Sequence, residues 1–308
     1  MKSNLMMMAV IASAGMTMVS CSSDNETLVE NVKPGKAHVR LVCGMGVSVS
    51  PMTRAALTAN VKALTDLYIL DYDKTTGKLL QVLHQTSTAA DFAEPDLTLD
   101  YGEHVLKVVA TRSTEPTLWD AGNNTWTVEP NILTPITSTQ PVMLTSTKTS
   151  DTFGAEKEVS VGIGMATTVS ISLDRLVAKL VINSTDVFPD DCTTITLDLQ
   201  EYSTLSWTTM DVTESVNNQR IADVTNLRGT TGTVFSYFVL TPKDGYQTDI
   251  TLTTNRTDGN PYSTITVPGV MLERNKATTI TGPIYGHSQG FQVTVNDALN
   301  SEGHDINI

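Results

Sequence analysis

Short runs in which apolar and polar residues alternate recur along almost the whole chain. The run HVRLVCGMGVSVS, residues 38–50, is apolar at nearly every odd position. A period of two is typical of a strand with one buried face. Similar runs rich in threonine and valine follow, separated by Gly and Pro, without long stretches of helical period. The sequence therefore predicts an all-β protein. The expected inward residues of its first strand are Val39, Leu41, Cys43, Met45, Val47 and Val49.

Turn residues place two of the expected hairpins. DYDKTTGKLL predicts a turn at 74–77, and Asp258-Gly259 separates two alternating runs, which is a strong hairpin signal. Short strands at this spacing predict β-sandwiches with Greek-key connections. The chain divides near 164–168 into halves of about seven expected strands each. We therefore expect an N-terminal β-sandwich domain at 38–165 and a C-terminal one at 166–308.

The N-terminal segment has the features of an export signal. Lys2 is followed by a short apolar run that ends in MVSC, with the cysteine at Cys21. This predicts a signal peptide at 1–20, because the run is too short to span a bilayer. MVSC resembles a bacterial lipobox, which makes Cys21 the expected lipidation site, and two or more acyl chains would hold the protein stably. The alternative is an ordinary signal peptide with Cys21 incidental. Residues 21–37 are polar and predict a flexible tether.

The net charge limits the classes of partner that we expect, and the cysteines limit the expected disulfide pairing. A net charge of −13 argues against nucleic acid and against anionic membrane surfaces as partners. A Cys43–Cys192 disulfide is compatible with an oxidising compartment. Two free, buried thiols are favoured, because Cys43 occupies an inward strand position and Cys192 falls in the other expected domain.

Two motifs imitate functional sites. GHSQG at 286–290 matches the nucleophile elbow of serine hydrolases around Ser288, with Asp297 and His304 following. That motif needs a helix after it, whereas a strand pattern follows here. DYDKTTG at 71–77 begins like a calcium loop, but its glycine comes one place late and the closing glutamate is missing. The sequence thus predicts no catalytic residues, no metal site and no cofactor.

Tryptophan offers the remaining candidates for ligand binding. Trp119 and Trp126 lie in or beside the loop-like segment LWDAGNNTWT. Exposed tryptophan can stack on a sugar ring, while packing into the edge of a sandwich is the alternative for both residues.

The segment PMTRAA, residues 51–56, directly follows the first strand. Cleavage between Arg54 and Ala55 by a trypsin-like protease would detach that strand. The loss would expose unpaired backbone and an apolar groove, which a replacement strand could fill.

Taken in order, these segments resemble the fimbrillin superfamily, the type V pilus subunits of Bacteroidota. The resemblance rests on the lipobox, TRAA, LTDLYILDYDKTTGKLL, YGEHVLKVVATR, LDRLVAKLVINSTDVFPDD and VMLERNKATTITGPIYG. It implies two tandem transthyretin-like β-sandwich domains, a surface-exposed lipoprotein of the outer membrane, and assembly by strand exchange. Arg54 and Ala55 match the position where an arginine-specific protease cuts shaft subunits. Anchor subunits instead keep the lipid and the first strand.

The sequence therefore predicts a non-enzymatic fimbrial subunit, of the minor accessory, tip or anchor type, that acts in cell adhesion. Its expected partners are other fimbrial subunits, the outer membrane through the lipid, and a receptor on a host cell, a bacterium or a glycan. The alternative is a surface lipoprotein that binds glycans for nutrient uptake through Trp119 and Trp126.

Overall fold

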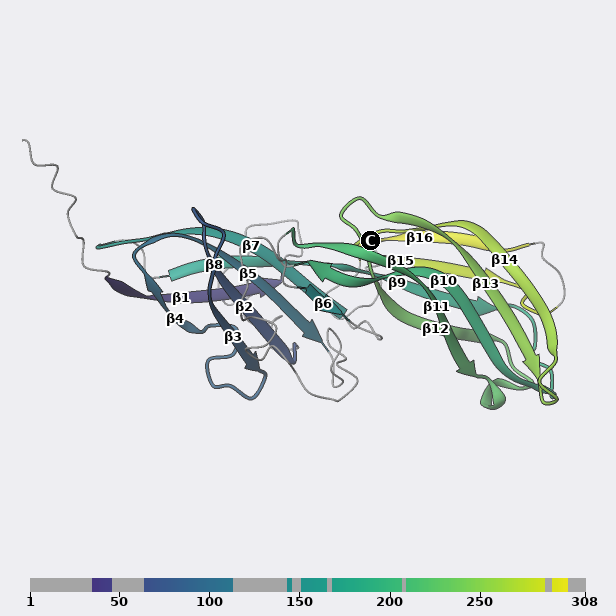
Figure 1. Cartoon of the computed structure of the whole chain (residues 1–308). Helices are drawn as coiled ribbons and strands as arrows, with labels where there is room; N and C mark the ends of the chain where they lie inside the picture. The colour runs from purple at the N-terminus through teal and green to yellow at the C-terminus, as the bar shows by residue number, and fades with distance from the viewer. Residues whose placement is uncertain are drawn as a thin grey trace, which may run out of the picture. The chain divides into compact units, whose positions relative to one another are not determined.

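The computed structural model describes residues 35–45, 64–112, 143–145, 151–164, 168–206, 209–285 and 290–298. Strands account for nearly all regular structure in these ranges, and a single 3-10 turn, η1 (Thr225–Leu227), is the exception. The described strands form two sheets, so the expected class, an all-β protein of two tandem β-sandwich domains, is confirmed (Figure 1).

The first sheet has the order β3-β2-β5-β7-β8-β1-β4. Because β7 and β8 share only two paired positions, Phe153↔Arg175 and Gly154↔Asp174, the sheet folds there into two layers. Its strands are β1 (Lys36–Met45), β2 (Asp66–Asp73), β3 (Leu79–Thr86), β4 (Asp96–Asp100), β5 (Gly102–Arg112), β7 (Asp151–Val161) and β8 (Thr168–Arg175).

The second sheet has the order β14-β13-β10-β12-β9-β15-β16, with β11 and β6 also paired to β10. A single paired position, Tyr202↔Leu240, joins β10 to β12, so this sheet also divides into two layers. Its strands are β6 (Met143–Thr145), β9 (Val177–Ser184), β10 (Cys192–Ser206), β11 (Asp211–Asp223), β12 (Gly232–Leu240), β13 (Tyr246–Arg256), β14 (Pro261–Leu272), β15 (Lys276–Gly282) and β16 (Gln292–Ala298).

The sheets change between β8 and β9, at Leu176. Strand β8 pairs with β1 and β7 and belongs to the first sheet. The boundary expected at 165/166 would separate β8 from the sheet that it joins. Similarly, β1 begins at Lys36, inside the segment expected to be tether. The first difference arises because a sequence pattern marks strands but not their partners, and the second because strand ends are the least certain part of such a pattern.

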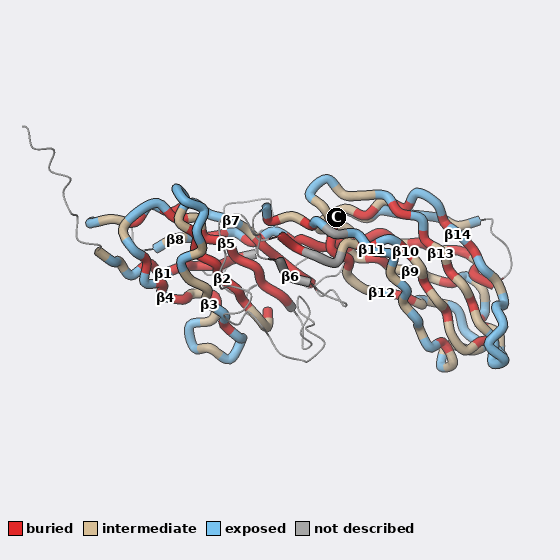
Figure 2. Tube along the Cα trace, in the orientation of Figure 1, coloured by how far each residue is buried: buried red, intermediate tan, exposed pale blue. Residues whose placement is uncertain are grey.

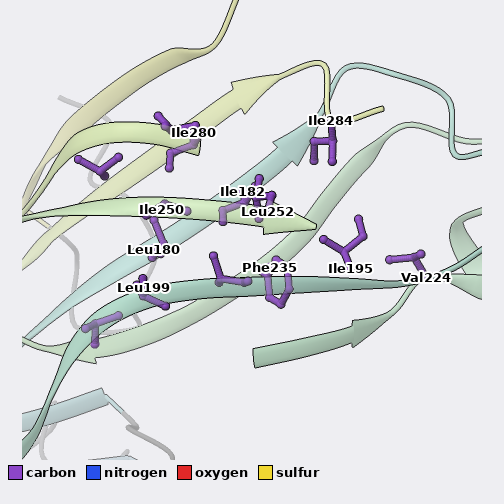
Figure 3. Packing of buried hydrophobic residues seen from close by; sticks show 14 of the residues in the cluster. Leu180, Ile182, Ile195, Leu199, Val224, Phe235, Ile250, Leu252, Ile280 and Ile284 are labelled. Carbon is purple, nitrogen blue, oxygen red and sulfur yellow. The ribbon is translucent and has the colours of Figure 1, made fainter. Parts of the chain in front are cut away.

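Each sandwich has its own apolar core, and buried positions concentrate on the strands while the hairpin tips are exposed (Figure 2). In the second core, Leu180 and Ile182 of β9 lie together with Ile250 and Leu252 of β13 (Figure 3). A third cluster joins residues of both sheets, among them Tyr68, Val109, Leu176 and Leu240. Burial of this kind supplies most of the favourable free energy of folding.

Both predicted hairpins are confirmed. At the β2–β3 turn, Gly77 has φ +67°, and Oδ1 of Asp73 accepts hydrogen bonds from the backbone N–H and the hydroxyl of Thr76. At the β13–β14 turn, Gly259 has φ +81°. Glycine suits these positions because it has no Cβ to oppose a positive φ.

Candidate functional site

Strand β1 is held by two strands that lie far from it in sequence. It pairs in parallel with β8, from Arg40↔Thr168 to Met45↔Leu173. On its other side it pairs antiparallel with β4, from Lys36↔Asp100 to Arg40↔Asp96. Neither pairing is a hairpin, so β1 is attached to the sandwich through its contacts rather than through a tight turn.

One face of β1 is fully buried. Val39, Leu41 and Cys43 have exposed fractions of 1%, 0% and 0%, as the alternating pattern predicts. They pack in the first core with residues of the two neighbouring strands, Leu97, Leu99, Ile171 and Leu173. Met45 ends the strand. Removal of β1 would therefore open an apolar groove between β4 and β8.

The backbone of β1 would leave unpaired groups behind as well. Leu41 N–H donates to the carbonyl of Pro95, and Cys43 N–H donates to the carbonyl of Ala93, both at 2.9 Å. If β1 left, these two carbonyls and the backbone groups of β4 and β8 that pair with β1 would lose their hydrogen-bond partners. Exposed strand edges of this type readily pair with another chain.

Exposed ion pairs lie beside β1 and add little to its attachment. Lys36 Nζ lies 3.4 Å from Asp100 Oδ1, and Arg40 contacts Glu94. Pairs exposed to solvent contribute about 0–1 kcal/mol each. The apolar face, at roughly 1.5–3 kcal/mol for each buried side chain, holds the strand.

A buried polar pair fixes the neighbourhood of β4. His104 Nδ1 lies 2.7 Å from Asp71 Oδ1, and its Nε2 lies 2.8 Å from the carbonyl oxygen of Asp100. Both ring nitrogens thus have a hydrogen-bond partner within the first sandwich. The pair thus links β2 to the last residue of β4, which is the register partner of Lys36.

The two described cysteines are free and buried, as favoured from the sequence. Cys43 lies in the first core and Cys192 in the second. Burial raises the pKa of the Cys43 thiol to about 12. Burial also raises the pKa of the Cys192 thiol, whose Sγ lies 3.7 Å from the Tyr285 hydroxyl. Neither thiol is therefore poised as a nucleophile.

Several predicted site residues lie outside the described ranges, and their roles stay predictions. They are the lipidation site Cys21, the processing site Arg54 and Ala55, the strand residues Val47 and Val49, and the ligand-stacking candidates Trp119 and Trp126.

The structure also bears on the two motifs that imitate functional sites. Gly290, the last residue of GHSQG, is followed by strand β16 rather than by the helix that a nucleophile elbow requires. In DYDKTTG, Asp71 is buried against His104, and Asp73 accepts the two bonds from Thr76. Both carboxylates thus have partners inside the fold.

Within the described ranges, no three His, Cys, Asp or Glu side chains gather as metal ligands would. The part of the chain that the structure describes also contains no apolar helix long enough to cross a membrane.

The second sandwich also carries a polar groove that its sequence did not predict. Its lining comes from 198–200, 217–219 and 247–249, with Gly269. The segment VNNQR, residues 216–220, carried the only signal, a run of carboxamides within a strand pattern. Such a run is equally typical of a solvated strand face, so the groove could not be predicted from it.

No protein-family model matches the sequence, and no curated protein matches it. Solved structures do. The fimbrial anchor protein Mfa2 from Porphyromonas gingivalis matches with a TM-score of 0.51 and 11% identity over 89% of this chain and 100% of that one. A candidate polysaccharide-binding protein from Bacteroides thetaiotaomicron matches with a TM-score of 0.53 and 9% identity over 87% of this chain and 99% of that one. A candidate cell adhesion protein from Bacteroides eggerthii matches with a TM-score of 0.50 and 16% identity over 87% of this chain and 97% of that one. The chain therefore shares its fold with fimbrial and adhesin-type proteins of Bacteroidota, as the resemblance to fimbrillins implied.

Proposed function

We propose that this chain is a fimbrial subunit of the fimbrillin superfamily, exported as a lipoprotein and acting in cell adhesion. It joins a fimbrium at the outer membrane surface by exchanging β1 for a strand of a neighbouring subunit. Its position is that of an accessory or tip subunit, and its partners are other fimbrial subunits and an adhesion receptor.

The place of β1 in the first sandwich carries this proposal. The strand fills a slot between β8 and β4, is joined to neither by a hairpin, and buries Val39, Leu41 and Cys43. At roughly 1.5–3 kcal/mol each, Val39 and Leu41 contribute about 3–6 kcal/mol, and the buried Cys43 adds to this. Since a whole domain is stable by about 5–15 kcal/mol, an emptied slot needs a replacement strand. Cleavage after Arg54 would release β1 from the rest of the chain and so allow this slot to empty.

The shared fold supports the same assignment. One similar structure is a fimbrial anchor protein and another a candidate cell adhesion protein, both matched over most of this chain. Neither description names an enzyme, which agrees with the absence of a catalytic role in this proposal.

The N-terminal mass of the chain from cell-surface and sheared-fimbria fractions tests the assignment. An N-terminus at Ala55 in fimbriae, with acylated Cys21 in the membrane fraction, is the expected result. An N-terminus at Cys21 in fimbriae would identify an anchor subunit that keeps β1. Absence of the chain from every fimbrial fraction would contradict a fimbrial role.

A second candidate function is glycan binding by a surface lipoprotein of a nutrient-uptake complex. The similarity to a candidate polysaccharide-binding protein favours it. Glycan-array binding that disappears in Trp126→Ala would favour this candidate, and an array that stays blank would count against it.

A further inference from the structure

The second sandwich carries an open groove of about 660 Å³. It lies over β10, β11 and β13, with Gly269 of β14 at its edge. This volume falls within the range of about 300–1,000 Å³ that is usual for ligand pockets. None of its lining residues belongs to β1.

The groove lies where β10 and β13 stop pairing. Their ladder runs from Cys192↔Arg256 to Asp198↔Thr251. Beyond it, Gln200 N–H donates to Thr248 Oγ1 at 3.2 Å, and the Tyr246 hydroxyl donates to the Gln200 carbonyl at 3.1 Å. Side-chain hydroxyls thus replace the backbone ladder, and the separated strands give the groove its width.

A bulge in β14 shapes the edge of the groove. The pairing of β13 with β14 shifts between Thr248 and Ile250, so that Pro268 and Gly269 lie opposite Asp249. Gly269 has φ +64°, and its N–H donates to Asp249 Oδ1 at 2.8 Å. Bulges often re-aim side chains beside functional sites. This one fixes the carboxylate of Asp249 at the groove.

The lining is dominated by uncharged polar groups. Among the described residues that line it, Asp198 and Asp249 are the only ionisable ones, and none is basic or aromatic. Gln219 Nε2 donates to Asp198 Oδ1 at 2.9 Å, which holds both side chains in place. The lining carboxamides are Gln200, Asn217, Asn218, Gln219 and Gln247.

Two of these carboxamides are available for a ligand. Asn217 and Gln247 are exposed, and neither side chain has a hydrogen-bond partner among the described residues. Each amide offers two N–H donors and one acceptor oxygen. Together with the two carboxylates, they place donors and acceptors side by side across the groove.

We propose that this groove binds a neutral saccharide. A sugar hydroxyl is both donor and acceptor, and adjacent hydroxyls match alternating carboxamides and carboxylates. Phosphate, sulfate and sialic acid fit poorly, because the lining offers no cation and two carboxylates would repel an anion. Without an aromatic platform the binding is weak for a single site. The inference shares a ligand class with the second candidate function but uses a different site, and it does not depend on strand exchange.

The test probes the full chain on an array of neutral hexose and N-acetylhexosamine oligosaccharides, with sialylated and sulfated glycans alongside. Binding to neutral glycans is expected. Titration calorimetry with the best neutral glycan should then show a loss of about tenfold in affinity for Asn217→Leu and for Gln247→Leu, since each removes direct hydrogen bonds. Both residues are exposed, so unchanged melting temperatures should accompany these losses.

Gln292→Leu is the matched control, because Gln292 is an exposed glutamine on β16 outside the groove. Its affinity should equal that of the unmodified chain. Four results would overturn the proposal: a blank array, a preference for anionic glycans, unchanged affinity in the Asn217→Leu/Gln247→Leu double variant, or an equal loss in Gln292→Leu. This test does not depend on whether the chain is found in fimbriae. A negative result would therefore overturn the saccharide proposal and leave the fimbrial assignment unchanged.

Discussion

Leu41 of β1 is the register partner of Val169 of β8 in a parallel pair. Their segments are separated by most of the first sandwich in sequence, yet Leu41 belongs to its core and Val169 packs against that core. A parallel pair of this kind cannot be closed by a two-residue turn. The strand therefore remains in place through packing and ladder bonds, which are interactions that a neighbouring subunit's strand could also make.

Truncation of Leu41 should weaken the first sandwich strongly. Leu41→Ala removes a side chain with an exposed fraction of 0% and is expected to cost about 2–5 kcal/mol of unfolding free energy. Arg40→Ala on the same strand is the control and should cost about 0–1 kcal/mol, since its pair with Glu94 is exposed. Chemical denaturation of the full chain measures both. Equal effects would mean that β1 does not contribute to the core.

The Cys43 thiol should report whether β1 is in place. With its pKa raised to about 12 by burial, it stays protonated and shielded while β1 is seated. In a Cys21→Ala/Cys192→Ala background, a thiol reagent at about pH 8 should label Cys43 only after β1 leaves the slot or the domain unfolds. Rapid labelling of the intact native chain would contradict the seated position of β1.

The same pKa shift predicts weaker folding in alkali. Cys43 binds its proton more tightly in the folded chain than in the unfolded one, where the pKa is near 9.0. Its contribution is therefore complete below pH 9 and is lost as the pH rises toward 12. In the Cys192→Ala background, a further Cys43→Ala change should flatten the fall in stability between these values. If the free energy of unfolding falls equally steeply with and without Cys43→Ala, the Cys43 thiol does not make this contribution.

Arg175 and Asp151 form a buried pair at the end of the first sheet. Arg175 Nε and Nη2 donate to the two carboxylate oxygens at 2.6 and 3.1 Å, and Nη1 donates to Asn275 at 2.6 Å. Arg175→Met should cost about 3–5 kcal/mol, because it leaves the Asp151 charge buried. The double variant with Asp151→Leu should recover part of that loss.

The exposed pair of Lys74 and Glu158 provides the comparison for this prediction. Lys74→Met should cost about 0–1 kcal/mol in the same denaturation experiment. A loss for Arg175→Met no larger than that for Lys74→Met would contradict the structural role of the buried pair.

Asp73 should make the β2–β3 hairpin sensitive to acid. Hydrogen bonds from the backbone N–H and the hydroxyl of Thr76 lower the pKa of its carboxyl below 3.8. Its contribution is therefore present above pH 3.8 and is lost as the pH falls through the lower value of the folded chain. Asp73→Ala should be less stable than the unmodified chain at neutral pH, and the difference should shrink in acid. A difference that is independent of pH would contradict this origin.

The sequence predicted local features better than long-range ones. The alternation at Val39, Leu41 and Cys43 identified a buried face, and Asp258-Gly259 located a hairpin, because both depend on neighbouring residues. The membership of β8 in the first sheet could not be read from pattern, since its partner β1 is distant in sequence. The groove was missed for a similar reason: Asn217 and Gln247 belong to separate strands, and only the fold brings them together.

The most direct test of strand exchange is photo-crosslinking from β8. Ser170 is exposed and is the register partner of Val42, so a photoreactive amino acid at this position faces whichever strand occupies the slot of β1. The crosslinked peptides from sheared fimbriae are identified by mass spectrometry. The account predicts a product that contains residues of a neighbouring subunit. A product that always contains residues 36–45 of the same chain would contradict it.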